Sequence, residues 1–462
     1  MNRKVGVIGL GYVGLPLACL TASKGIETIG FDLNKKKIEL ISNGISPIRD
    51  KSVSTELDIA LKSDNLSLSN SIDDLSECNI YLVCVPTPIL ENKQPDLSIL
   101  LNATEMICEV LKTDDILIIE STVFPGTCED YVEKLIFDKT NMDSRKDYVL
   151  SHCPERVNPG DPYWNTSNIP RVIGSTTKEG NLKAAQFYAQ ILEGEIIEVK
   201  DIQKRICRSS LPTHDENNNK KNIPNGSITL METIRDAEAV KAMENTVRDV
   251  NIAFVNELAK ISRVLKLDIV DIIDGMETKP FGKGPYYPGI GVGGHCIAVD
   301  PEWLKNASNK AGYFPEMINL ARHTNNEMAV FAVNIIKDLC QKSGLNHKDL
   351  NCLLLGVSYK KNIDDSRESP FYTVEELAKD TFKSISVYDP FFPEISTSNN
   401  LETLVNNTDI IILITNHDIF VDFIHSFDFS NTTVKIMFDG RNCIDSNKIA
   451  GNIIYSGIGI RN

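Results

Sequence analysis

Cys296 stands in the run Gly-Val-Gly-Gly-His-Cys-Ile-Ala-Val-Asp, which extends from Gly291 to Asp300. A cysteine thiolate beside a hydride acceptor can capture an aldehyde as a thiohemiacetal, which a second oxidation turns into a thioester. Water then releases the thioester as a carboxylic acid. The alternative is that Cys296 is a small buried apolar residue, which is the commoner role of a free cysteine.

A glycine-rich loop near the start of the chain predicts the hydride acceptor. Gly-Leu-Gly-Tyr-Val-Gly, from Gly9 to Gly14, follows a strand-like run and opens a helix. These glycines permit a tight turn, close approach of a pyrophosphate and close packing of helix on strand. Asp32, about 20 residues further on, would accept hydrogen bonds from an adenosine ribose and repel a 2′-phosphate. NAD is therefore expected rather than NADP, and FAD is the remaining alternative.

Four polar residues could assist a nucleophilic cysteine. Lys241 and Asn245 lie four apart on a predicted helix and so share a face, where they could hold an alkoxide and orient a water, or simply face solvent. Glu155 follows a predicted strand end, where ligands collect in open α/β sheets, but a surface carboxylate fits equally well. Asp300 could orient Lys241 or a hydrolytic water, or cap the helix that begins at Pro301.

Three further residues stand at predicted strand ends. Thr122 could line a nicotinamide pocket or form a structural turn. Lys360 and Arg367 could bind phosphate or carboxylate, or pair with Asp364 or Asp365. The expected cofactor-binding residues are Gly9, Gly11, Tyr12, Val13, Gly14, Asp32, Thr87 and Thr122.

Short β-rich runs alternate with helical stretches such as 97–111 and 128–137 over residues 1–200. This alternation predicts a doubly wound parallel sheet in an NAD-binding domain. The predicted strands are Val5–Ile8, Glu27–Phe31, Ile80–Val85, Ile116–Glu120 and Tyr148–Ser151. Residues 201–232 are polar and are interpreted as an exposed insertion.

From Thr233 to Leu265, apolar residues recur at steps of three and four, which predicts one helix of about 34 residues. Such a length suggests a homodimer interface within a central helical domain, 233–343. A second Rossmann-like domain is expected over 344–462. Its predicted strands are Cys352–Val357, Ile385–Tyr388, Ile410–Thr415 and Lys435–Phe438. The expected fold is α/β, with two doubly wound Rossmann-like domains joined by a long central helix.

Composition excludes some classes of protein. The 48 basic and 63 acidic residues give a net charge of −15, which argues against nucleic acid as the main partner. The eleven cysteines contain no Cys-x-x-Cys pair, so neither a metal site nor a disulfide framework is predicted, and this usage fits a reducing cytosol. No window approaches the ~20 apolar residues needed to span a bilayer, and the N-terminus does not resemble a signal peptide. A soluble, cytoplasmic enzyme is expected.

Together these motifs resemble the nucleotide-sugar 6-dehydrogenase family, which includes the UDP-glucose and GDP-mannose dehydrogenases. The resemblance is carried by Gly-Gly-His-Cys with Asp300 four residues on, the Lys241 and Asn245 pair, Pro-Glu at 154–155, and Tyr-Lys-x-Asn-x-Asp-Asp-x-Arg-Glu-Ser-Pro from Tyr359. It implies a four-electron, NAD-dependent oxidation of a sugar C6 alcohol to a carboxylate.

The resemblance also implies a role for each residue. Cys296 would be the thioester nucleophile, and Lys241, assisted by Asn245, would stabilise oxyanions. Asp300, Glu155 and Thr122 would handle the hydrolytic water and its proton. Lys360, Arg441 and the loop ending at Gly293 and Gly294 would hold a UDP-sugar in the C-terminal domain. The expected substrate-binding residues are Glu155, Lys241, Asn245, Tyr286, Tyr287, Gly293, Lys360, Arg367 and Arg441.

Glu120-Ser-Thr, in place of the Lys-Ser-Thr usual in UDP-glucose enzymes, favours a 2-acetamido sugar. Runs around Cys296 and from Arg248 resemble UDP-N-acetylmannosamine dehydrogenases, whereas runs from Asn168 and Tyr286 resemble N-acetylglucosamine and galactosamine enzymes. Mannosamine is favoured because its matches flank the nucleophile and the catalytic helix, and the acid would be a surface-polysaccharide precursor. Two other classes are considered: a two-electron β-hydroxyacid dehydrogenase with a passive Cys296, and an NAD-responsive binding protein without catalysis.

Overall fold

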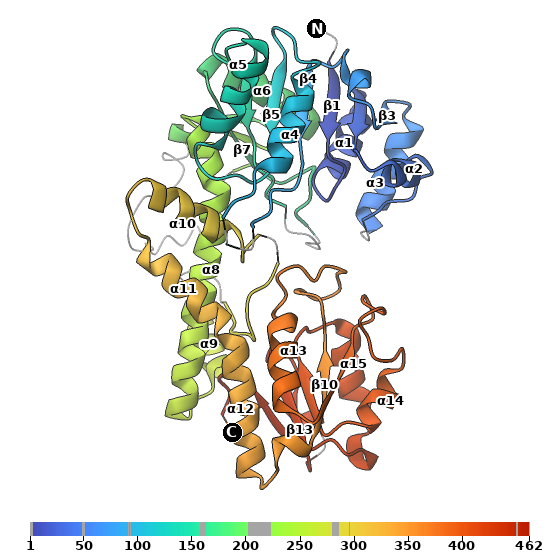
Figure 1. The fold of residues 1–462 in the computed structure, drawn as a ribbon, viewed down its shortest axis with the longest axis vertical. Helices are drawn as coiled ribbons and strands as arrows, with labels where there is room; N and C mark the ends of the chain where they lie inside the picture. The colour runs from blue at the N-terminus through green and yellow to red at the C-terminus, as the bar shows by residue number, and fades with distance from the viewer. Residues whose placement is uncertain are drawn as a thin grey trace. The chain divides into compact units, whose positions relative to one another are not determined.

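The computed structural model describes residues 3–48, 51–90, 92, 94–157, 163–201, 223–279, 286–294, 296–449 and 451–461. The chain divides into two units (Figure 1). The first unit holds residues 1–244 and 302–311, and the second holds 245–301 and 312–462.

The first unit is built on a nine-stranded sheet in the order β3-β2-β1-β4-β5-β6-β7-β9-β8. Strands β1 to β6 pair in parallel, so their carboxyl ends share one edge, whereas β7 runs antiparallel to β6. All five predicted strands are present, each within two residues at either end. The strands are β1 (Lys4–Ile8), β2 (Glu27–Phe31), β3 (Leu66–Ser69), β4 (Ile80–Val83), β5 (Ile116–Ile119), β6 (Val149–His152), β7 (Arg171–Ser175), β8 (Ile196–Glu198) and β9 (Ile228–Leu230).

Helices cover this sheet because its strands are apolar on both faces. Residues of β1 pack in one core with apolar side chains of α1, α3 and α6. The predicted helix 97–111 is α4, and 128–137 begins with the π-helical turn η2. The helical segments are α1 (Gly14–Ser23), α2 (Lys35–Ser42), α3 (Lys51–Lys62), η1 (Ile72–Leu75), α4 (Ser98–Ile107), η2 (Cys128–Glu133), α5 (Lys134–Thr140) and α6 (Lys178–Leu192).

Strand β9 corrects the expectation of an exposed insertion over 201–232. Its three residues, 228–230, are buried and pair with both β7 and β8. The prediction is therefore wrong for these residues, because a three-residue strand is too short to leave a periodic signal. Residues 202–222 lie outside the described part of the chain.

Helix α8 (Ile234–Leu265) confirms the predicted long helix, with 32 residues. Part of its apolar stripe is exposed in the described chain, while its buried side mixes polar residues with apolar ones such as Ala253 and Val255. The exposed apolar residues are Met243, Val247, Phe254, Ile261, Val264 and Leu265, and the buried polar ones include Asn245, Thr246, Asp249, Asn256 and Ser262. Several large apolar side chains of α8 are therefore uncovered, although polar ones are buried.

The second unit is built on a parallel five-stranded sheet in the order β11-β10-β12-β13-β14. Alternate residues of β10 enter two cores, one shared with α12 and α13 and the other with α14 and α15, so helices cover both faces (Figure 1). The four predicted strands are present, but β14 was not predicted. The strands are β10 (Asn351–Leu355), β11 (Ser384–Tyr388), β12 (Ile410–Leu413), β13 (Ile436–Asp439) and β14 (Ile454–Gly457).

The remaining helices of the chain follow α8. They are α9 (Ile269–Glu277), α10 (Asp300–Lys310), α11 (Glu316–Asn326), α12 (Met328–Lys342), η3 (His347–Asp349), α13 (Pro370–Thr381), α14 (Leu401–Asn406), α15 (Asp418–Ser426), η4 (Phe429–Asn431) and η5 (Ser446–Lys448). Most of α10 falls in the first unit, where Trp303 packs on Phe124 with ring centroids 5.8 Å apart. Among the described helices, none combines the length and apolar character required to cross a membrane.

Candidate active site

The loop between β1 and α1 has the shape that a dinucleotide pyrophosphate requires. Gly9 has a φ of +93°, which favours glycine. A Cβ at Gly14 would meet the Gly9 carbonyl oxygen at 1.9 Å, whereas a Cβ at Gly11 would meet nothing within 4 Å. Helix α1 has no side-chain cap at Val13 and no acidic residue in its first turn, so its dipole and N–H groups favour an anion. These residues fit a bound dinucleotide.

Asp32 follows β2 beside this loop. One carboxylate oxygen accepts the Leu10 N–H at 3.0 Å and the Lys37 ammonium at 2.6 Å. The other oxygen accepts the Asn34 N–H at 2.9 Å. Burial raises the pKa of Asp32, but the hydrogen bond from Lys37 and the two backbone N–H groups outweigh it, and the pKa lies below its ordinary value. The carboxylate is thus ionised, as its predicted role with a ribose requires.

Thr87 and Thr122, both predicted to lie near the cofactor, are joined by a hydrogen bond. The Thr87 hydroxyl donates to the Thr122 carbonyl at 2.7 Å, and the Ser121 hydroxyl donates to the Val85 carbonyl at 2.7 Å. These segments follow β4, which lies next to β1 in the sheet, and β5, which lies next to β4. The carboxyl ends of parallel strands meet at one edge, so both threonines lie at the edge that carries the glycine loop.

Glu155 lies three residues beyond β6 and is firmly held. One carboxylate oxygen accepts the N–H groups of Arg156 and Val157, at 2.6 and 2.5 Å. The other lies 3.5 Å from the guanidinium of Arg171, a buried residue that also pairs with Glu120. A surface carboxylate, the alternative for Glu155, is therefore excluded, because its side chain is only 12% exposed.

Cys296, Asp300 and Asn245 come together in the second unit. The Asp300 N–H donates to the Cys296 carbonyl at 2.8 Å, so the two residues share one helical turn at the start of α10. The Asn245 amide donates to the Asp300 carboxylate at 2.5 Å, and both side chains are buried. Cys296 itself is half-buried. The structure therefore fixes the Asp300 carboxylate from α8, within one helical turn of Cys296.

Lys241 is half-buried and lies one helical turn before Asn245 on α8, so the two share a helix face. Lys241 belongs to the first unit, and Asn245 begins the second.

The loop that ends at Gly294 is fixed within the second unit. The Gly294 N–H donates to the Arg367 carbonyl at 2.9 Å. A Cβ at Gly293 would meet the Tyr359 side chain at 2.8 Å, and the Ile290 N–H donates to the backbone beside Arg441. The glycines therefore permit close packing against the segment that carries Lys360 and Arg367. Gly294 lies two residues before Cys296.

The remaining predicted substrate residues differ in their contacts. The Arg367 guanidinium pairs with Asp365 through two nitrogens. The sequence had left this pairing open as the alternative to phosphate binding. Arg441 donates from Nε to the Ile414 carbonyl at 2.8 Å. Tyr287 is exposed and donates to the Asp274 carboxylate at 2.8 Å. Lys360 and Tyr286 are half-buried.

Two structural contributors were missed from the sequence. Arg171 stands in the run from Asn168 that carried part of the resemblance, but it was not predicted as a site residue. Asn256 accepts the Gly289 N–H at 3.0 Å and donates to Asn325 at 2.9 Å, so it holds the glycine loop from α8. A signal for Asn256 existed, because Asn245, Asp249 and Asn256 recur at helical spacing on one face.

Family models match three successive parts of the chain. The NAD binding, central and UDP binding domains of the UDP-glucose/GDP-mannose dehydrogenase family match residues 3–192, 235–327 and 353–446. A UDP-N-acetyl-D-mannosamine dehydrogenase of Pyrococcus horikoshii is 31% identical over 99% of each chain. The chain belongs to the UDP-glucose/GDP-mannose dehydrogenase family.

Other comparisons of this dehydrogenase agree with its membership. A UDP-N-acetyl-D-glucosamine 6-dehydrogenase of Salmonella typhi is 34% identical over 84% of this chain and 82% of its own. The solved structure of a UDP-D-ManNAc dehydrogenase from Pyrococcus horikoshii superposes with a TM-score of 0.85 at 30% identity, covering 99% of both chains. The predicted pair of Rossmann-like domains with a long helix is thereby confirmed, and NAD is the cofactor of this dehydrogenase.

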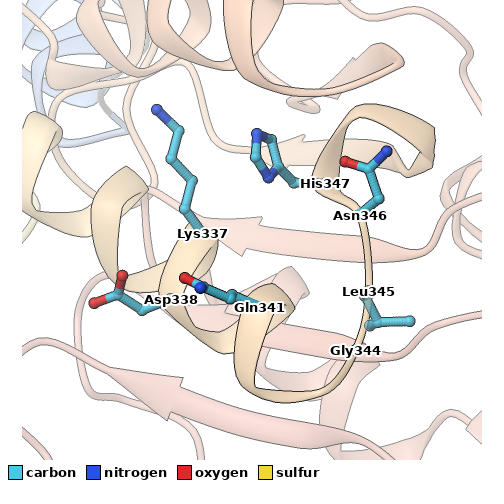
Figure 2. Close-up of a pocket in the computed structure, with 7 residues that line it drawn as sticks. All are labelled: Lys337, Asp338, Gln341, Gly344, Leu345, Asn346 and His347. Atoms are coloured by element: carbon cyan, nitrogen blue, oxygen red, sulfur yellow. The ribbon is translucent and has the colours of Figure 1, made fainter.

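Figure 2 shows a surface hollow of the dehydrogenase where α12 ends and the chain turns toward η3. It is lined by Lys337, Asp338, Gln341, Gly344, Leu345, Asn346 and His347. None of these is a predicted site residue. Among the described residues, no group of three or more His, Cys, Asp or Glu side chains could hold a metal ion.

Proposed function

We propose that this dehydrogenase oxidises C6 of UDP-N-acetyl-D-mannosamine to the carboxylate, with two NAD reduced per sugar. The sugar is proposed because relatives named for it match nearly the whole chain. The observation that carries the four-electron reaction is the Asp300 carboxylate, fixed by Asn245 within one turn of Cys296. A passive cysteine would need no oriented carboxylate beside it.

NAD, when bound at the glycine loop and Asp32, supplies the acceptor for one hydride in each oxidation. In the first oxidation the Lys241 ammonium stabilises the negative charge on the C6 oxygen. The Cys296 thiolate then adds to the aldehyde carbon and keeps its sulfur–carbon bond through the second oxidation. Asn245, which shares a helix face with Lys241, keeps Asp300 oriented throughout.

Hydrolysis completes the reaction. Asp300 and Thr122 orient a water, and Glu155 accepts its proton as the water oxygen adds to the thioester carbonyl. The thiolate of Cys296 leaves and is ready for another cycle. The resulting uronate is proposed as a precursor for surface polysaccharide.

The substrate is proposed to bind in the second unit, whereas the first unit is proposed to hold NAD. Lys360 and Arg367 supply cations for the diphosphate. Arg441 and the loop with Gly293 enclose the nucleotide sugar, and Tyr286 or Tyr287 contacts it. This assignment keeps the NAD-binding (1–200), central (233–343) and UDP-sugar-binding (344–462) parts, and moves β9 out of the expected insertion (201–232) into the sheet of the NAD-binding part. We place the enzyme in the cytoplasm, where NAD and UDP-sugars are made.

A homodimer through α8 is also proposed. Large apolar side chains are exposed on this helix, where Phe254 is 59% exposed, and also on α11, where Met317 is 70% exposed. An uncovered apolar surface of this kind is typical of a subunit interface. Phe254→Glu should convert a dimer into a monomer in light scattering, whereas Ile59→Glu, at an exposed isoleucine on α3, should not. A monomeric unmutated protein would overturn this assignment.

The test of function is the amount of NADH formed per UDP-sugar consumed, with UDP-N-acetylmannosamine, -glucosamine and -galactosamine supplied separately. Two NADH per UDP-N-acetylmannosamine support the proposal. Two NADH with another of these sugars correct the substrate and keep the chemistry. One NADH per sugar would assign a two-electron reaction and remove the thioester role from Cys296.

A further inference from the structure

Three strands bring three charged residues to one place in the first unit. Glu120 directly follows β5, Glu155 lies three residues past β6, and Arg171 begins β7. Because β5 and β6 are parallel and β7 is antiparallel to β6, the carboxyl ends of the first two strands meet the amino end of the third. Tyr188 of α6 reaches the same place. We call Glu120, Glu155, Arg171 and Tyr188 the arginine cluster.

Arg171 divides its guanidinium between the two carboxylates. Its Nη1 lies 3.0 Å from each carboxylate oxygen of Glu120, and its Nη2 lies 3.5 Å from Glu155. Tyr188 donates its hydroxyl to Glu120, and its ring lies 5.0 Å from the guanidinium carbon. Glu120, Arg171 and Tyr188 are all essentially buried.

The charge balance of this cluster is unequal, with two carboxylates facing one cation. Burial, and then the negative charge of Glu155, raise the pKa of Glu120 to about 7, although Arg171 and Tyr188 oppose that rise. The other titratable groups that face it are Cys84, Cys153 and Tyr188, whose pKa values burial raises, so they are uncharged at neutral pH.

We propose that Arg171 is a positioning residue for Glu155, and that Glu120, by taking the other side of the guanidinium, sets how readily Glu155 accepts a proton. This inference rests on the proposed function, in which Glu155 takes the proton of the hydrolytic water. When Glu120 is ionised, it shares the Arg171 charge with Glu155, and less of that charge opposes proton transfer to Glu155. When Glu120 is neutral, the whole cation stabilises the Glu155 carboxylate and makes it a weaker base.

The test is Glu120→Gln, which keeps the size of the side chain and removes its charge. The unmutated enzyme should show a several-fold rise in kcat as Glu120 ionises near pH 7, and Glu120→Gln, which mimics the neutral carboxyl, should lack that rise. Above pH 7 kcat of the variant should therefore be several-fold lower, and the thioester on Cys296 should accumulate in intact mass spectra, with KM for both substrates unchanged. Ser175→Ala, which removes the buried Ser151 to Ser175 hydrogen bond between β6 and β7, should move neither readout.

A second measurement needs no turnover. Thermal unfolding of Glu120→Gln, Glu155→Gln and the double variant forms a cycle, and carboxylates that share one arginine should give Tm changes that are non-additive by several degrees. Additive changes, or a kcat of Glu120→Gln that rises through pH 7 as in the unmutated enzyme, overturn the inference even in an active enzyme. Non-additive changes in a protein that oxidises no UDP-sugar would reject the proposed function and leave the coupling of the cluster standing.

Discussion

His152 should make the folded protein less stable at low pH. It is the last residue of β6 and is fully buried, and neither ring nitrogen has a hydrogen-bond partner among the described residues. Burial lowers the pKa of His152 from 6.5 to about 3. The folded protein therefore holds the imidazole neutral where an unfolded chain would protonate it.

The magnitude follows from linkage. The folded-state pKa lies below the unfolded value, so the stabilisation is complete above about pH 6.5 and is lost as the pH falls toward 3. The loss is about 2 kcal/mol at pH 5 and roughly 5 kcal/mol below pH 3. His152→Leu removes this loss. At pH 8 it should be at least as stable as the unmutated protein, since a buried polar group without a partner costs about 1–3 kcal/mol.

The assay is the apparent Tm at pH 8 and pH 5, at one scan rate. We expect the advantage of His152→Leu over the unmutated protein to grow by about 4 °C between these pH values. His347→Gln, which removes a half-buried imidazole from η3, should leave the pH dependence of Tm unchanged. Equal pH dependence in His152→Leu and the unmutated protein would refute the reasoning, because the buried neutral imidazole would then carry none of the acid sensitivity.

Three further predictions concern cofactor and chemistry. Gly14→Ala places a methyl against the Gly9 carbonyl oxygen, so we expect NAD affinity to fall more than tenfold in calorimetry, with about 1–3 kcal/mol of lost stability. Asn245→Ala leaves the buried Asp300 carboxylate without its amide donor, and single-turnover hydrolysis should slow about ten- to hundredfold. Cys296→Ser should lower NADH production more than about a thousandfold and abolish the trapped thioester in mass spectra. A variant that retains near-normal values in its assay would contradict the role given to that residue.

Much of the first unit could be predicted because its signals are local. The loop from Gly9 to Gly14 and the apolar strand runs depend on residues close together in the chain, and the strands appear within two residues of the predicted bounds. The same holds for Cys296 and Asp300, whose spacing of four residues places them in one helical turn. The family resemblance rested on these local motifs and is confirmed by the matches along the chain.

Other features needed the tertiary structure. The antiparallel β7 and the short β9 enter the first sheet through pairings that no periodicity encodes. The stripe on α8 was predicted, but which face of the helix is buried depends on the elements packed around it. Here polar residues of α8 are buried among apolar ones, because they find partners on other elements: Asp249 pairs with Arg322 of α11 at 2.6 Å.

The sequence by itself determined which reactive groups this protein carries: a dinucleotide loop, the thiol of Cys296 and a helix bearing Lys241 and Asn245. The tertiary structure decided which groups surround them. Arg171 meets Glu120 across 51 residues and Glu155 across 16, and Asn245 meets Asp300 across 55. Side-chain contacts at such separations depend on strand order and helix docking, which emerge only when the whole chain folds.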